Sequence, residues 1–234
     1  MASPGVDAEI TDILRTLLLS GRLPGGTRLV ETELAEAFGV TRERVRKALH
    51  RLGAERLIEL VPNRGAFVAS PSLADARAIY DARRILEGGL VFALAGTITD
   101  RQIAELETHL AREHAAAHSR DRSRGVSLSG EFHLKLAEMS GNPFIVAYVR
   151  ELVSRTSMLV AIFEEGAPSC GVEEHARIIA ALKQRNGARA AEESTIHLSL
   201  IETRLRPAEA KPVRQADIAE LIRDALAARE GERV

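Results

Sequence analysis

The densest group of basic side chains lies between residues 41 and 51. The stretch contains five arginines and lysines and one acid, Glu43, so its net charge is +4 (Arg42, Arg44, Arg46, Lys47 and Arg51). The whole chain has a formal charge of -1, so this excess is local. Positive charge gathered on one element can neutralise nucleic-acid phosphates. An isolated basic run can also be a solvated helix face. The structures predicted for the neighbouring segments therefore determine which of the two interpretations is favoured.

The apolar spacing predicts a helix through this stretch, with Thr41 as its N-cap and an end near residue 56. One side of the helix is apolar: Val45, Ala48, Leu49 and Leu52. The opposite side is polar: Glu43, Arg46, Lys47, His50 and Arg51, with Arg42 at the exposed N-terminal end. This division is typical of a recognition helix, whose back packs on its domain while its first turns reach base edges.

The segments before it predict two more helices. The first covers residues 6–20 and has one apolar face: Ile10, Ile13, Leu14, Leu17 and Leu18. Glycine and proline residues between 21 and 26 break it, and a second helix follows over 31–38 until Gly39 ends it. Two short helices joined by a glycine-containing turn predict a helix-turn-helix.

A hairpin is predicted after the recognition helix. Strand-like runs at 57–61 and 66–69 flank Pro62, Asn63, Arg64 and Gly65. Gly65 can take a positive φ there, which places Arg64 at the tip of a β-hairpin wing. The basic helix and the basic-tipped wing together favour a domain that binds double-stranded DNA.

Residues 7–70 resemble the DNA-binding domain of the GntR regulator family. Four segments carry the resemblance: GRLPGGTRL (21–29), TELAEAFGVTR (32–42), VRKALHRL (45–52) and PNRGAFV (62–68). The resemblance implies that Arg42 and Arg46 make the main base and phosphate contacts and that Thr41 holds a phosphate. It also implies that Arg64 and Gly65 enter the groove from the wing. We place Glu43, Lys47 and Asn63 in the same expected interface.

The recognition helix departs from the family pattern at its start. The usual Ser-Arg-Thr-Pro-Val-Arg-Glu is Thr-Arg-Glu-Arg-Val-Arg-Lys in residues 41–47. Glu43 could accept a hydrogen bond from cytosine N4 and change the preferred base. It could also do no more than favour the helix N-terminus through the dipole. Both alternatives stay open, so the operator sequence is not determined.

The rest of the chain reads as helical, after a short polar junction at residues 70–72. Helices are predicted over 73–96, 100–119, 126–140, 144–165, 171–186, 188–206 and 213–230, with glycine or proline at the breaks, among them Gly125 and Gly187. No segment alternates with a period of two, so the fold class is mainly α: a winged helix-turn-helix followed by an all-α bundle. The expected divisions are 1–70 (DNA-binding domain), 71–74 (linker), 75–206 (effector-binding domain) and 207–234 (extension). The last helix could pack on the bundle, extend a dimer contact or remain unpacked.

Residues 75–206 resemble the FCD ligand-binding domain of the FadR subfamily. The carrying segments are YDARRILE (80–87), EFHLKLAEMSGNP (131–143) and HARIIAALKQRNGARAA (175–191), followed by His197. In many FCD domains an aspartate and three histidines bind a divalent metal that helps to hold a small carboxylate effector. The histidine positions correspond to His133, His175 and His197, and Ser129 stands at the aspartate position. Three imidazoles can still hold Zn²⁺, or else Ni²⁺ or Mn²⁺, with water or effector in the open position. Hydrogen-bonded core histidines are the structural alternative.

Arg83 is the expected partner of an effector carboxylate, since its planar fork suits bidentate binding. A salt bridge to Glu87, one helical turn on, is the alternative. We leave His114 and His118 out of the site, because their surroundings, Glu113 among them, read as a solvated face. Asn142 reads as a turn residue.

These observations predict a homodimeric regulator, a repressor that binds an inverted-repeat operator and responds to a small carboxylate. A metal-free sensor of a bulkier ligand such as an acyl-CoA is the alternative, and a metal-dependent hydrolase is a remote one. We expect no enzyme, because the chain lacks a His-Glu-x-x-His motif, a phosphate loop and a serine elbow. The single cysteine, Cys170, and the lack of a signal peptide or a 20-residue apolar run favour the cytoplasm without membrane attachment.

Overall fold

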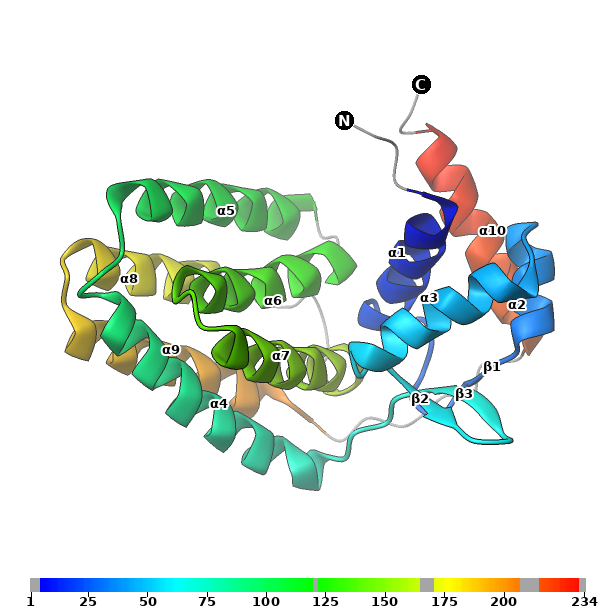
Figure 1. The fold of residues 1–234 in the computed structure, drawn as a ribbon, viewed down its shortest axis with the longest axis horizontal. Coiled ribbons are helices and arrows are strands. Elements are labelled where there is room, and N and C mark those ends of the chain that lie inside the picture. Colours follow the sequence, from blue (N-terminus) through cyan, green and yellow to red (C-terminus); the bar gives the residue numbers. More distant parts are fainter. Residues whose placement is uncertain (1–4, 120–121, 165–170, 207–214, 232–234) are drawn as a thin grey trace. The chain divides into compact units, whose positions relative to one another are not determined.

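The computed structural model describes residues 5–119, 122–164, 171–206 and 215–231. The chain divides into two compact units, one of residues 1–70 with 209–234 and the other of residues 71–208. Figure 1 shows the elements of both units. The fold is mainly helical, with one small sheet in the first unit, as the sequence predicts. In the described ranges no helix is both long and apolar enough to cross a membrane.

The first unit is built on three helices: α1 (Val6–Leu19), α2 (Glu31–Phe38) and α3 (Arg42–Ala54). Both α1 and α2 pack against α3. The apolar side of α3 is buried as its spacing predicts: Val45, Ala48, Leu49 and Leu52. Gly39 ends α2 in the left-handed region at φ 64°, which allows the chain to turn directly into α3.

The wing consists of β2 (Ile58–Val61) and β3 (Gly65–Val68), paired antiparallel with Val61 opposite Gly65. Asn63 and Gly65 have positive φ values of 60° and 102°, so the expected left-handed turn at Gly65 is present. A third strand, β1 (Arg28–Leu29), was not predicted and pairs with β3 to give the order β1-β3-β2. Two residues are too few to show the alternation by which a strand is recognised.

The C-terminal helix α10 (Gln215–Gly231) belongs to the first unit, where it packs on α1 and α2. Ile218 and Ile222 are buried, and Arg22 lies 3.9 Å from Asp224. None of the three alternatives for this helix, which were packing on the bundle, a dimer contact and a loose end, included this position. Its apolar residues do predict burial, but their spacing cannot name the partner surface.

The second unit is a bundle of six helices in the described residues: α4 (Leu73–Leu94), α5 (Asp100–Ser119), α6 (Arg122–Met139), α7 (Pro143–Phe163), α8 (Val172–Lys183) and α9 (Gly187–Arg204). The helices α5, α6 and α7 pack in sequence, α8 packs on α5 and α9, and α9 lies along α4 (Figure 1). Ser72 and Asp75 form a capping box at the start of α4, and the Asn142 side chain caps α7. The main core includes Val91, Leu106 and Phe132.

The predicted break at Gly125 is wrong. Gly125 lies buried within α6, which already begins at Arg122. A glycine inside a helix costs only about 1 kcal/mol relative to alanine, so packing can override the break signal. Gly125 also lines a cavity of the second unit.

Candidate metal site and DNA interface

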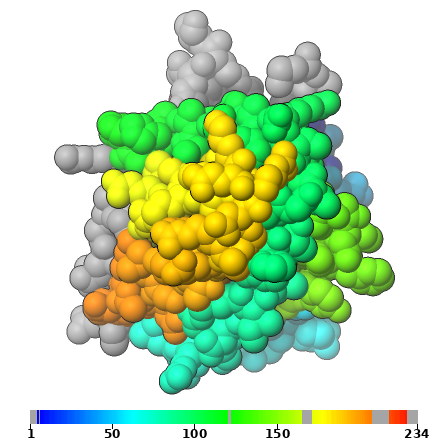
Figure 2. Space-filling model, turned by 90° about the vertical axis from the view of Figure 1, so that its left-hand side faces the viewer, coloured from blue at the N-terminus to red at the C-terminus, as the bar shows by residue number. Residues whose placement is uncertain are grey.

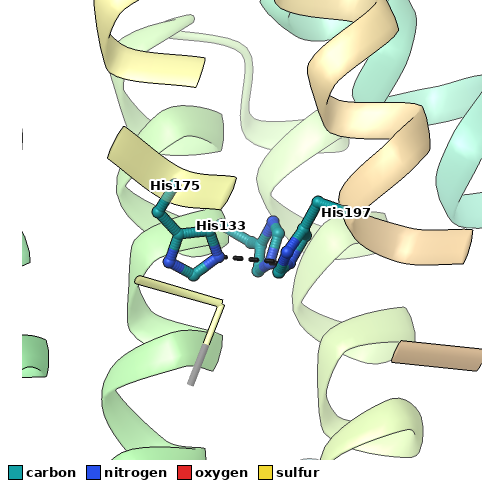
Figure 3. Close-up of side chains that lie close together, drawn as sticks. All are labelled: His133, His175 and His197. Carbon is teal, nitrogen blue, oxygen red and sulfur yellow. Dashed lines mark hydrogen bonds between the residues drawn. The ribbon is translucent and has the colours of Figure 1, made fainter. Parts of the chain in front are cut away.

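Three buried histidines from three helices meet in the second unit. His133 comes from α6, His175 from α8 and His197 from α9 (Figure 3). Nε2 of His197 lies 3.2 Å from Nε2 of His133 and 3.1 Å from Nε2 of His175. The structure therefore brings together the three histidines that the sequence analysis selected, with one nitrogen of each directed at a common point.

Each ring has a carboxylate on its other side. Nδ1 of His175 lies 2.7 Å from Glu113, and Nδ1 of His133 lies 2.7 Å from Glu87. Nδ1 of His197 is 4.0 Å from Glu174. The hydrogen bond between His175 and Glu113 favours the tautomer with the proton on Nδ1, which leaves the Nε2 lone pair for a metal. Glu87 lies at the same distance from Nδ1 of His133, whereas Glu174 is too far from His197 for a hydrogen bond.

Burial keeps two of the rings neutral. It lowers the pKa of His133 to about 4, although Glu87 opposes the shift. Burial, with His175 and His133 beside it, also holds the pKa of His197 well below its ordinary value. Burial alone would raise the pKa of Glu87, but Arg83 and His133 hold it at about 2. A neutral ring at neutral pH is the form that binds a cation.

The donor set fits a divalent metal, and two further observations support the fit. Among the described residues, Nδ1 of His197 is buried without a hydrogen-bond partner, so one polar atom of the cluster is unsatisfied. Gly171 forms a cradle against the same ring, since a Cβ there would lie 2.7 Å from Nδ1 of His197. Three imidazoles are also a common Zn²⁺ ligand set. The cluster is consistent with a metal site of the kind typical of FCD domains, and the identity of the metal stays open.

Glu113 is buried, so the prediction that it lies on a solvated face is wrong. It is 1% exposed, and besides His175 it has His109 at 3.2 Å. His109 is buried as well and lies 2.8 Å from the carbonyl oxygen of Leu128. The signal available in the sequence was the pair His109 and Glu113, one helical turn apart on the face that buries Leu106 and Ala116.

A cavity of about 50 Å³ adjoins the histidine cluster. Ser129, at the family's aspartate position, and His133 line it together with Arg83, Tyr80 and Thr156. Arg83 pairs with Glu87 at 2.5 Å and donates a hydrogen bond to Thr156 at 2.8 Å, so this structure displays the salt-bridge alternative for Arg83. In the part of the chain that the structure describes, the Tyr80 hydroxyl is buried without a hydrogen-bond partner, and burial raises its pKa. A buried hydroxyl without a partner is costly, so the wall of this cavity has an unused polar group.

In the first unit, the expected DNA-contacting residues of α3 are all exposed: Thr41, Arg42, Glu43, Arg46 and Lys47. Thr41 occupies the N-cap position, but its side chain makes no capping hydrogen bond. Glu43 lies 3.2 Å from Lys47, an ion pair that neither alternative for Glu43 included. The wing residues Asn63, Arg64 and Gly65 are exposed too, and the Arg64 guanidinium lies 5.8 Å from the centre of the Phe67 ring.

A groove of about 470 Å³ runs between α3, the start of α2 and the wing. It brings together four of the expected residues (Arg42, Arg46, Asn63 and Gly65), whereas Thr41, Glu43, Lys47 and Arg64 lie outside its lining. Glu31 was not predicted at this site, but it lines the groove and accepts two hydrogen bonds from Arg46, at 2.9 and 2.8 Å. These bonds lower the pKa of Glu31.

Comparisons with known proteins assign a family model to each of the two units. Residues 7–68 match the family model of bacterial regulatory proteins of the gntR family, and residues 78–200 match that of the FCD domain. The HTH-type transcriptional repressor RspR of Escherichia coli is 26% identical over 86% of this chain and 89% of its own. An HTH-type regulator from an unstable DNA locus of Streptomyces ambofaciens is 30% identical over 73% of this chain and 72% of its own. The fold resembles that of a GntR regulator from Rhodococcus sp. RHA1, with a TM-score of 0.69, 24% identity and coverage of 84% and 95%.

Proposed function

The chain belongs to the GntR family of bacterial regulators with an FCD domain, and from this premise we propose that it is a dimeric repressor released from its operator by a small carboxylate. The family makes it a DNA-binding transcriptional regulator and not an enzyme. The observation that carries the finer proposal is the cavity that joins the histidine cluster to Arg83 and Tyr80. RspR, similar over most of both chains, is named a repressor, which supports the direction of the response.

His133, His175 and His197 would hold the metal, with Zn²⁺ as our first expectation and Ni²⁺ or Mn²⁺ as alternatives. When bound, the ion would supply positive charge to the effector carboxylate. Ser129 adds no charge to the site, so the cavity side of the cluster is open to an anionic ligand. In this proposal the effector takes the place of the aspartate carboxylate of other FCD domains.

Two groups of the cavity wall suit a small polar anion. Arg83 has a planar fork that can turn from Glu87 to an effector carboxylate, and the Tyr80 hydroxyl can donate to it. The volume of about 50 Å³ favours a ligand of few atoms over an acyl-CoA. We therefore prefer the small carboxylate to the metal-free sensor of a bulky ligand.

A thermal-shift screen of small carboxylates, with and without Zn²⁺, Ni²⁺ and Mn²⁺, tests this function in protein purified without a histidine tag. We expect a carboxylate that raises Tm only with metal and that releases the protein from DNA. Tyr80→Phe should leave Tm unchanged or slightly higher without ligand, because its buried hydroxyl has no hydrogen-bond partner among the described residues, and it should weaken effector binding about 3- to 10-fold. Tyr148→Phe, at an exposed tyrosine, is the matched control. Carboxylates that act equally without metal would support the metal-free alternative.

Dimerisation is the second part of the proposal, and an apolar face of the second unit supports it. Ile85 and Phe92, seven residues apart on α4, are 79% and 59% exposed. The neighbouring α9 exposes Ile196 and Leu200, and Gly88 faces Thr195 across the seam between these helices. Figure 2 shows α8 in yellow, α9 in orange and α4 in teal on one face of the molecule. Exposed large apolar side chains on adjacent helices are typical of protein interfaces, and we assign this face to a second copy.

Phe92→Glu should convert the dimer to a monomer, because it would place two carboxylates in the interface. Light scattering behind a size-exclusion column measures the mass directly. Phe144→Glu is the control. Phe144 is 73% exposed on α7, so this variant introduces the same chemical change on another face of the second unit. If only Phe144→Glu dissociates the dimer, the interface lies on α7 and our assignment is wrong.

A further inference from the structure

Glu31 holds the guanidinium of Arg46 by one of its two hydrogen-bonding edges. Nε of Arg46 lies 2.9 Å from one carboxylate oxygen, and Nη2 lies 2.8 Å from the other. This is the bidentate fork that fixes both the plane and the direction of a guanidinium. Arg42, one turn earlier on α3, adds a weaker contact to the same carboxylate at 3.4 Å.

Among the described residues, no hydrogen bond engages the other edge of Arg46, which is formed by Nη1 and the second hydrogen of Nη2. An arginine reads guanine through two parallel donors to O6 and N7, a pair that the end-on edge supplies. The carboxylate therefore occupies the side-on edge and leaves the end-on pair of donors available to a base. It leaves the reading edge on an exposed side chain of the groove.

Among the described residues that line this groove, Glu31 is the one acid, and Arg28, Arg42 and Arg46 line it as well. A carboxylate near a DNA backbone opposes phosphate binding, so a groove built only for affinity would not contain it. Its position is understandable if it improves selectivity: it orients the reading group and weakens sequence-independent attraction at the same time.

We propose that Glu31 is a positioning residue that presents the end-on edge of Arg46 to a guanine of the operator and thereby increases the preference for operator over other DNA. The inference deepens the proposed function and rests on the docking of α3 in the major groove. It predicts a site with a guanine at the position that Arg46 reaches.

The test uses a duplex that the protein itself selects from a random pool, compared with a scrambled duplex of the same composition. We expect Glu31→Gln to weaken binding to the selected duplex about 5- to 10-fold, since an amide can accept from only one of the two donors. Binding to the scrambled duplex should be unchanged or about 2-fold tighter, since a negative charge is removed. Replacing the contacted guanine by 7-deazaguanine should weaken the wild type and leave Glu31→Gln unaffected.

Two further variants separate the possible roles. Glu31→Asp keeps the charge but shortens the side chain, so it should lose preference for the selected duplex without tighter scrambled binding. Glu36→Gln removes the same charge from an exposed site of α2 outside the groove and should change neither ratio. Equal tightening on both duplexes with Glu31→Gln would show a purely electrostatic effect and overturn the proposal, as would an unchanged 7-deazaguanine penalty. If Arg46→Ala has no effect on the selected duplex, the docking of α3 itself is wrong, which is a separate failure.

Discussion

His197→Gln is expected to remove most of the stabilisation that the protein gains from Zn²⁺. At a metal concentration about 100 times Kd, a ligand that binds only the folded state adds about 2.7 kcal/mol. For a unit of this size that corresponds to a rise in Tm of about 5–10 °C. Loss of one of three imidazoles should weaken the site at least about 100-fold, which leaves a rise of about 1–2 °C. Differential scanning fluorimetry at fixed metal, followed by a chelator, measures both values.

His197 is the informative histidine of the three, because Nδ1 of this ring lies 4.0 Å from Glu174, whereas His133 and His175 each have a carboxylate at 2.7 Å. Replacing His175 would instead take a close partner from buried Glu113, and the fold could suffer for that reason alone. His114→Gln, at an exposed histidine of α5, is the matched control and should keep the full metal shift. A shift that survives in His197→Gln and disappears in His114→Gln would contradict the assignment of the buried cluster.

The features that depend on residue spacing within a single helix were predictable from the sequence. The division of α3 into buried Val45, Ala48 and Leu49 and exposed Arg46 and Lys47 follows from helical spacing, and the structure confirms it. Such patterns need no knowledge of the rest of the fold. For the three histidines the resemblance to a family supplied what spacing could not, since His133 and His197 are 64 residues apart in the chain.

The carboxylates that contact the site residues were not predictable, because they come from segments that are distant in the sequence. Glu113 reaches His175 from another helix, 62 residues away, and nothing local marks which carboxylate is buried. Glu31 also lies 15 residues before the arginine that it holds. Helix periodicity identifies a buried face but not its partner, and α10 shows the same limit, since its burial was readable and its place on α1 and α2 was not.

Arg46→Ala is expected to weaken operator binding about 10- to 100-fold, because it removes a side chain that lies in the groove between α3 and the wing. Filter binding or fluorescence anisotropy on the selected duplex measures the loss, and a titration in salt distinguishes its origin. A residue that mainly contacts phosphate would lower the salt slope by about 1 and weaken all sequences alike. A residue that reads a base would reduce preference with little change in slope.

The structure favours the second outcome for Arg46, because Glu31 already neutralises part of its charge and fixes its plane. A double-mutant cycle makes the argument quantitative. If Glu31 acts through Arg46, Glu31→Gln should have no further effect on the preference for the selected duplex once Arg46 is alanine. Arg101→Ala, at an exposed arginine of the second unit, is the control and should leave binding unchanged. Unchanged operator binding in Arg46→Ala would mean that α3 does not present this face to DNA, and the wing would then have to carry the recognition.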